Sequence, residues 1–167
     1  GVRRCGKSTL LSQLQQIHQI PSNAAVHINF EDPRLAGYRN TALLDQIYTF
    51  ATEHCSQPLT FFLDEIQNVK WINTLLSSNE SYRYVVTGSN SKLFSGDLAS
   101  TLTERHLSHE LFPFNFKEYQ AATNSSSLFG LIESGGFPAT FDFSKPQQLL
   151  QQYFVDIIDK DIRERVA

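Results

Sequence analysis

The sequence contains no methionine and only two cysteines, Cys5 and Cys55, among its 167 residues. No Cys-x-x-Cys pair or Cys/His cluster is present, which argues against a zinc site or a disulfide scaffold. Two free thiols fit a reducing compartment, so we expect a cytoplasmic protein. No apolar run approaches the roughly 20 residues of a membrane-spanning helix, and no signal peptide is visible, so we expect no membrane partner.

Positive charge is not in excess. The sequence has 14 Lys and Arg residues and 17 Asp and Glu residues, which gives a net charge of -3. This balance argues against a nucleic-acid-binding surface across the whole chain, and leaves nucleic acid as a partner of a longer protein only. With 41% hydrophobic and 19% charged residues, the composition is that of a globular domain. The missing initiator methionine indicates a fragment that lacks its first strand and is cut within its last helix.

Hydrophobic periodicity predicts an alternation of helices and strands. Apolar residues at helical spacing predict helices at 7–19, 39–55, 116–122 and from about 150 to the end, with shorter ones near 71–76 and 93–102. Short apolar runs predict strands at 24–30, 59–63, 82–87 and 106–111. The polar cluster 124–127 is typical of a turn or helix N-cap. The pattern favours an α/β fold with a mainly parallel sheet flanked by helices and a helical C-terminal portion.

Residues 1–8, GVRRCGKS, match the P-loop pattern G-x-x-x-x-G-K-[ST] in full. Glycines permit backbone angles that a Cβ disfavours, so the loop N–H groups can surround an anion at a helix N-terminus. Lys7 is expected on the β- and γ-phosphates and Ser8 on Mg²⁺. The expected nucleotide-binding residues are Gly1, Arg3, Arg4, Cys5, Gly6, Lys7, Ser8 and Thr9.

The side chains between the two glycines of the motif have no role that the pattern itself assigns. We expect those of Arg3 and Arg4 in solvent. Cys5 is either a filler or, beside a helix N-terminus, a reactive thiol.

The apolar strand 59–63 ends in two carboxylates, Asp64 and Glu65. Ligands bind at the carboxyl ends of strands in open α/β sheets, so Asp64 is expected to hold Mg²⁺ and Glu65 to polarise the attacking water. The alternative is that the pair only caps the next helix. No Asn-Lys-x-Asp guanine motif is present, and the acidic pair downstream of a P-loop favours ATP hydrolysis. After strand 82–87, Ser89 or Asn90 could orient the water, although Gly-Ser-Asn is also an ordinary turn.

The blocks GVRRCGKSTLL, INFEDPRL, FFLDEIQNVKW, YVVTGSNSKLF, LTERHLSHELFPFNFKEY, GGFP and YFVDIIDKDIRER resemble those of the prokaryotic AAA-type ATPases that carry a C-terminal domain of unknown function. The resemblance covers essentially the whole chain. It implies that residues 1–9 are Walker A, that 64–65 are Walker B, and that 89–90 lie in the sensor-1 region. It also implies an ATPase core at residues 1–123 and a helical extension at 124–167 that leads to a further domain.

Arg105 falls where the family has Leu-x-Gly-Arg, and the resemblance makes it an arginine finger or phosphate sensor. Here the stretch reads LTER, with Glu104 in place of Gly, and a surface ion pair with Glu104 or Glu110 is the alternative.

The sequence thus predicts a Mg²⁺-dependent ATPase. Its expected catalytic residues are Lys7, Glu65, Asn90 and Arg105, and its expected metal ligands are Ser8 and Asp64. An arginine finger could act within the chain, or from a second chain, which would imply a homo-oligomer or a partner protein. The alternative function is a nucleotide-dependent switch that does not hydrolyse ATP.

Overall fold

The computed structural model describes residues 3–38, 40–69, 82–88 and 107–159. Contacts between Cα atoms divide the chain into two compact units, one of residues Lys7–His109 and one of Gly1–Gly6 with Glu110–Ala167. The expected domain boundary between residues 123 and 124 stays a prediction. The short helices predicted near 71–76 and 93–102 lie outside the described residues.

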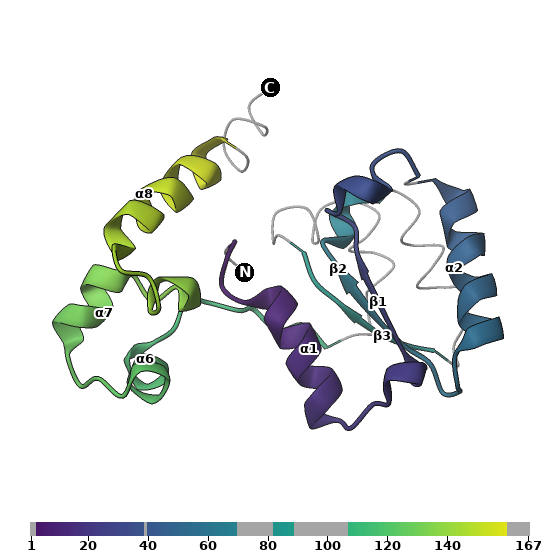
Figure 1. The fold of residues 1–167 in the computed structure, drawn as a ribbon, viewed down its shortest axis with the longest axis horizontal. Helices are drawn as coiled ribbons and strands as arrows, with labels where there is room; N and C mark the ends of the chain where they lie inside the picture. The colour runs from purple at the N-terminus through teal and green to yellow at the C-terminus, as the bar shows by residue number, and fades with distance from the viewer. Residues whose placement is uncertain (1–2, 39, 70–81, 89–106, 160–167) are drawn as a thin grey trace. The chain divides into compact units, whose positions relative to one another are not determined.

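A parallel sheet forms the centre of the first unit (Figure 1). Its described strands are β1 (Ala25–Asn29), β2 (Thr60–Asp64) and β3 (Arg83–Val86), in the order β1-β2-β3. All five residues of β2 are buried, as its continuous apolar run predicts for a strand with a neighbour on each side. The register pairs Asn29 with Asp64 and Leu63 with Val86. The carboxyl ends of the strands therefore share one edge, and the α/β fold class is confirmed.

Helices α1 (Lys7–Ile17) and α2 (Thr41–His54) lie on opposite sides of this sheet (Figure 1). Side chains alternate along β2: Phe61 and Leu63 belong to the hydrophobic core against which α2 packs. Phe62, on the other face, stacks on His27 with ring centroids 4.5 Å apart. The Nε2 of His27 donates to Oε1 of Gln15 in α1 at 2.7 Å. Both faces of β2 are thus covered, which holds its carboxyl end in place.

The second unit is helical, with α6 (Phe116–Thr123), α7 (Leu128–Ser134) and α8 (Pro146–Ile157). Asn115 and Glu118 form a capping box at the start of α6. Ser127 caps α7 through its hydroxyl group, as the polar cluster 124–127 predicts. The rings of Phe114 and Tyr119 both pack on Phe141, with centroids 5.4 and 5.3 Å apart.

Two expectations about these elements were wrong or incomplete. Residues 107–111 of the predicted fourth strand form no strand, and the Leu107 side chain is 91% exposed. A strand needs a neighbour for its backbone hydrogen bonds, and none of the described residues pairs with this segment. Helix α7 was not predicted, because its seven residues are too few for the apolar spacing of a helix to repeat.

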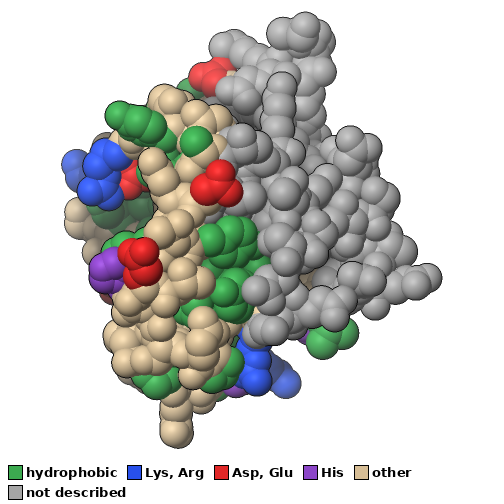
Figure 2. Space-filling view, turned by 90° about the vertical axis from the view of Figure 1, so that its right-hand side faces the viewer, with side chains coloured by type: hydrophobic (Ala, Val, Ile, Leu, Met, Phe, Trp, Pro, Cys, Tyr) green, Lys and Arg blue, Asp and Glu red, His purple; other side chains and the backbone are tan. Residues whose placement is uncertain are grey.

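On the described part of the face that Figure 2 draws, the Lys and Arg side chains lie in small separate groups. Among the described residues, no helix combines the length and the apolar character that crossing a membrane requires.

Candidate functional site

The first turn of α1 and the end of β2 bring together both expected metal ligands and two of the expected catalytic residues. The Oγ of Ser8 donates to Oδ2 of Asp64 at 2.5 Å. The Nζ of Lys7 lies 4.0 Å from Oε1 of Glu65, and these two side chains are only 11% and 13% exposed. Asp64 is buried, with 5% of its surface exposed. Two motifs that are far apart in the sequence therefore form one charged site at the edge of the sheet.

The second oxygen of the Asp64 carboxylate is bound by a residue that the sequence did not single out. Thr87 follows β3, and its Oγ1 donates a short hydrogen bond to Oδ1 of Asp64. The N–H of Thr87 donates to the carbonyl of Leu63 at 2.8 Å, which extends the pairing between the two strands. The signal was the run of small polar residues that begins at the end of the predicted strand 82–87. Of the two residues that we selected from it, neither Ser89 nor Asn90 lies among the described residues.

Glu65 has a left-handed backbone conformation, with φ 55° and ψ 48°. Residues other than glycine rarely adopt it, and such conformations cluster at functional sites. The short 3-10 helix η3 (Ile66–Asn68) follows, but the Glu65 side chain makes no capping hydrogen bond to it. Glu65 therefore does not act as the side-chain cap of that helix, which was the alternative to a catalytic role.

The first half of the P-loop belongs to the helical unit. Gly6 has φ +91°, a conformation that glycine adopts without strain. The Cys5 side chain is buried, 2% exposed, and its thiol donates to the carbonyl of Arg3 at 3.7 Å. This burial fits the interpretation of Cys5 as a filler and not as a reactive thiol, since reactive cysteines are partly exposed.

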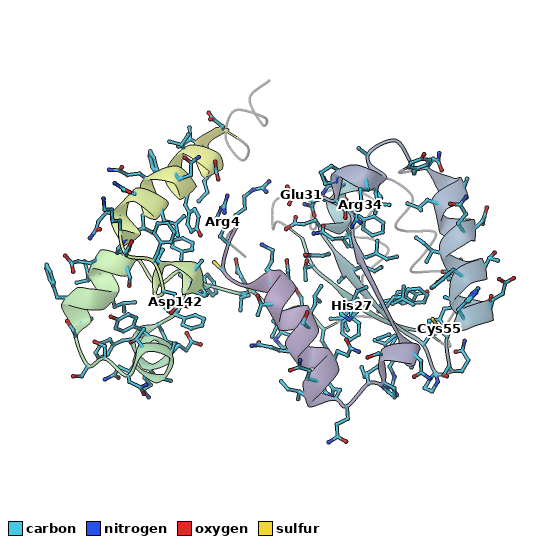
Figure 3. The ribbon with its side chains drawn as sticks, in the orientation of Figure 1. Arg4, His27, Glu31, Arg34, Cys55 and Asp142 are labelled. Carbon is cyan, nitrogen blue, oxygen red and sulfur yellow. The ribbon has the colours of Figure 1, made fainter. Side chains whose placement is uncertain are left out.

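Arg4 does not extend freely into solvent as expected. Its Nη2 lies 2.5 Å from Oδ2 of Asp156 in α8, with 47% of the Arg4 side chain exposed. The guanidinium carbon lies 4.4 Å from the centre of the Tyr153 ring, also in α8. Figure 3 labels Arg4 on the segment that precedes α1. A P-loop residue is thus bound to the last described helix.

The other predicted site residues differ in what the structure shows of them. Thr9 lies in the first turn of α1 and is exposed. Gly1, Asn90 and Arg105 lie outside the described residues.

The Ser8 hydroxyl and the Asp64 carboxylate have the ligand chemistry that Mg²⁺ prefers, since both offer hard oxygen atoms. The described ranges contain no group of three or more His, Cys, Asp or Glu residues that could hold a metal. A nucleotide-dependent Mg²⁺ site needs no such group, because phosphate oxygens and water supply most of the ligands. The donor set therefore fits Mg²⁺ bound together with a nucleotide.

A parallel sheet, a P-loop motif at the start of α1 and an acidic pair after the central strand define an α/β protein with a P-loop NTPase-type fold. The family described as "AAA domain" matches residues 1–120. The chain belongs to this family.

Two similar proteins come from distant organisms. The chain is 31% identical over 183 residues to an uncharacterized protein of Haemophilus influenzae, covering 100% of this chain and 46% of that protein. It is 33% identical over 187 residues to an uncharacterized protein of Methanocaldococcus jannaschii, covering 99% of this chain and 41% of that protein. No solved structure matches the chain. The chain therefore spans less than half the length of these two relatives.

Proposed function

We propose that the protein binds ATP and hydrolyses it in a Mg²⁺-dependent reaction. The proposal rests mainly on two contacts between the P-loop and the acidic pair. Ser8 donates a hydrogen bond to Asp64 at 2.5 Å, and Lys7 forms an ion pair with Glu65 at 4.0 Å. Phosphate-binding groups at a helix N-terminus and a carboxylate pair at a strand end are the parts that nucleotide hydrolysis needs. The AAA domain match over residues 1–120 supports the same conclusion.

Each residue has a distinct role in this reaction. Lys7 binds the β- and γ-phosphates, with the backbone N–H groups of the P-loop around them. Ser8 and Asp64 hold Mg²⁺, which neutralises charge on the phosphates. Glu65 accepts a proton from water as the water oxygen attacks the γ-phosphorus. Asn90 as a water-orienting residue and Arg105 as an arginine finger or phosphate sensor stay predictions.

We further propose that the protein is one of the prokaryotic AAA-type ATPases with an additional C-terminal domain. The chain covers only 46% and 41% of the two relatives, so both are long enough to contain a further domain. In that arrangement residues 1–123 form the ATPase core and 124–167 the extension that leads to the further domain.

The test compares Glu65→Gln with Lys7→Ala in the intact protein, by phosphate release and by binding of a fluorescent ATP analogue. Glu65→Gln should bind the analogue normally while turnover falls about 100-fold or more, because a general base contributes about that much. Lys7→Ala should lose binding. Glu53→Gln is the matched control, since the Glu53 side chain on α2 is 63% exposed.

Two results would change the proposal. Equal turnover in Glu65→Gln and the unaltered protein would remove Glu65 from the mechanism. Tight ATP binding without any phosphate release from the unaltered protein would favour the switch that does not hydrolyse ATP.

A further inference from the structure

Gln67 contacts the carboxylate of Glu65 from within the short helix η3. Its Nε2 donates to Oε2 of Glu65 at 2.5 Å. Hydrogen bonds from a neutral donor to a charged acceptor are short and about twice as strong as neutral pairs. This contact fixes the orientation of the carboxylate. It also leaves the other oxygen, Oε1, as the one that faces Lys7 at 4.0 Å.

The other end of the same amide group has no partner. The Oε1 of Gln67 is buried, and among the described residues no group donates a hydrogen bond to it. A buried acceptor without a donor costs about 1–3 kcal/mol, so such atoms in native structures need an explanation. Rotating the amide by 180° gives no solution, because its oxygen would then face the carboxylate oxygen of Glu65.

The neighbouring residue Asn68 shows that the two amides of this turn have different targets. The Nδ2 of Asn68 donates to the main-chain carbonyl of Glu65 at 3.1 Å. Asn68 therefore supports the left-handed backbone of Glu65, at φ 55°, whereas Gln67 contacts only its carboxylate.

We propose that Gln67 orients both Glu65 and the attacking water in ATP hydrolysis, an inference that rests on the proposed function. The Nε2 holds the Glu65 carboxylate, and the unpartnered Oε1 accepts a hydrogen bond from the water. One water proton passes to Glu65 as the water oxygen bonds to the γ-phosphorus. The bond to the bridging oxygen breaks, and its electron pair leaves with ADP. The other proton, which faces Gln67, stays on the phosphate product, and Gln67 itself exchanges no proton.

The test uses Gln67→Leu, which keeps the size of the side chain and removes both its donor and its acceptor. The kcat for ATP should fall about 10- to 100-fold, because misplacing a reacting group by about 1 Å can cost about 100-fold. The KM for ATP and the affinity for ADP should change less than about 2-fold, since no phosphate contact is lost. Gln16→Leu makes the same substitution at an exposed position of α1 and is the control that should keep the kcat. A kcat loss in Gln67→Leu that comes with an equal loss of affinity for ADP would show general damage to the site and overturn the proposal.

A double-mutant cycle with Glu65→Gln distinguishes orientation from general damage. If Gln67 works on the same step as Glu65, adding Gln67→Leu to Glu65→Gln should lower turnover by less than about 2-fold. Independent losses that multiply would contradict the proposal. An intact protein that releases no phosphate would overturn the proposed function and this role with it. Active protein with an unchanged kcat in Gln67→Leu would overturn the role of Gln67 alone.

Discussion

At the scale of single residues, the carboxylate of Asp64 shows how the site is held. One of its oxygens accepts a hydrogen bond from Ser8 and the other from Thr87. Because Asp64 is only 5% exposed, water cannot readily replace a lost donor, and a buried carboxylate without partners is unfavourable. Thr87 therefore controls the orientation of the oxygen that Ser8 contacts.

We predict that Thr87→Val weakens Mg²⁺ binding in the presence of ATP. Loss of a group that orients a metal ligand typically costs about 10- to 100-fold in metal affinity. The concentration of Mg²⁺ that gives half-maximal phosphate release should rise by about 10-fold or more. Thr87→Ser keeps the hydroxyl group and should behave like the unaltered protein. An unchanged Mg²⁺ dependence in Thr87→Val would show that Thr87 does not support the metal ligand.

His27 predicts a pH dependence of stability. Partial burial of the ring lowers the pKa of His27 from its ordinary value of 6.5. The unfolded chain then binds more protons than the folded chain below pH 6.5, so the free energy of unfolding decreases as the pH falls through this value. Urea denaturation at pH 7.5 and at pH 5.5 measures the difference. His27→Phe keeps a ring against Phe62 and should reduce the decrease, whereas His54→Gln leaves His27 intact and should retain it.

The sequence predicted some residues of the site and missed others for identifiable reasons. Lys7, Ser8, Asp64 and Glu65 stand at fixed positions of a motif or at the end of an apolar strand, so their proximity could be predicted. Among several small polar residues after strand β3, only the strand register shows which one reaches Asp64. The contact of Gln67 with Glu65 depends on a short 3-10 turn and on the left-handed backbone of Glu65. Neither the 3-10 turn nor the left-handed backbone is indicated by a pattern in the sequence.

At the scale of elements, Arg4 of the P-loop binds α8. Arg4 pairs with Asp156 at 2.5 Å and lies over the ring of Tyr153 at 4.4 Å. Arg4 also has a left-handed backbone, with φ 63°, which is unfavourable for a residue with a Cβ. The contacts with α8 offset this strain, so α8 helps to hold the conformation of the loop.

We predict a measurable coupling between Arg4 and Asp156 in the free energy of unfolding. Partly exposed ion pairs contribute about 0.2–1 kcal/mol. A double-mutant cycle of Arg4→Ala and Asp156→Ala should give a coupling energy of about 0.5–1 kcal/mol. A cycle of Arg4→Ala with Glu53→Ala is the control and should give no coupling, because Glu53 on α2 is 63% exposed and pairs with His54. A coupling for Arg4 and Asp156 no larger than that of the control would contradict a role of α8.

The elements themselves were predicted where a periodic pattern existed. The leucine stripe of α1 and the apolar run of β2 gave bounds within two residues of those observed. The run 106–111 has a similar composition to a strand, but pairing depends on a neighbour that no local pattern reveals. The contact between Arg4 and α8 joins residues 152 positions apart, which explains why the sequence indicated only a solvent-exposed arginine.

At the scale of the whole molecule, binding at the proposed site must be linked to folding. Lys7, Ser8, Asp64 and Glu65 come from a helix start and a strand end that only the folded unit Lys7–His109 brings together. A ligand that binds the folded chain and not the unfolded chain stabilises it by mass action. The size of this stabilisation depends on the ligand concentration relative to its Kd.

We predict that MgATP raises the temperature of thermal unfolding. At about 100 times the Kd, a ligand stabilises the folded state by about 2.7 kcal/mol. For a chain of this size that corresponds to roughly 5–10 °C. Scanning calorimetry with MgATP should show this shift in the unaltered protein and in Glu65→Gln, which loses turnover and keeps binding. Lys7→Ala should show no shift, whereas Lys117→Ala, a change in the separate helical unit, should show the full one. An equal shift in Lys7→Ala and in the unaltered protein would show that MgATP binds elsewhere on the chain.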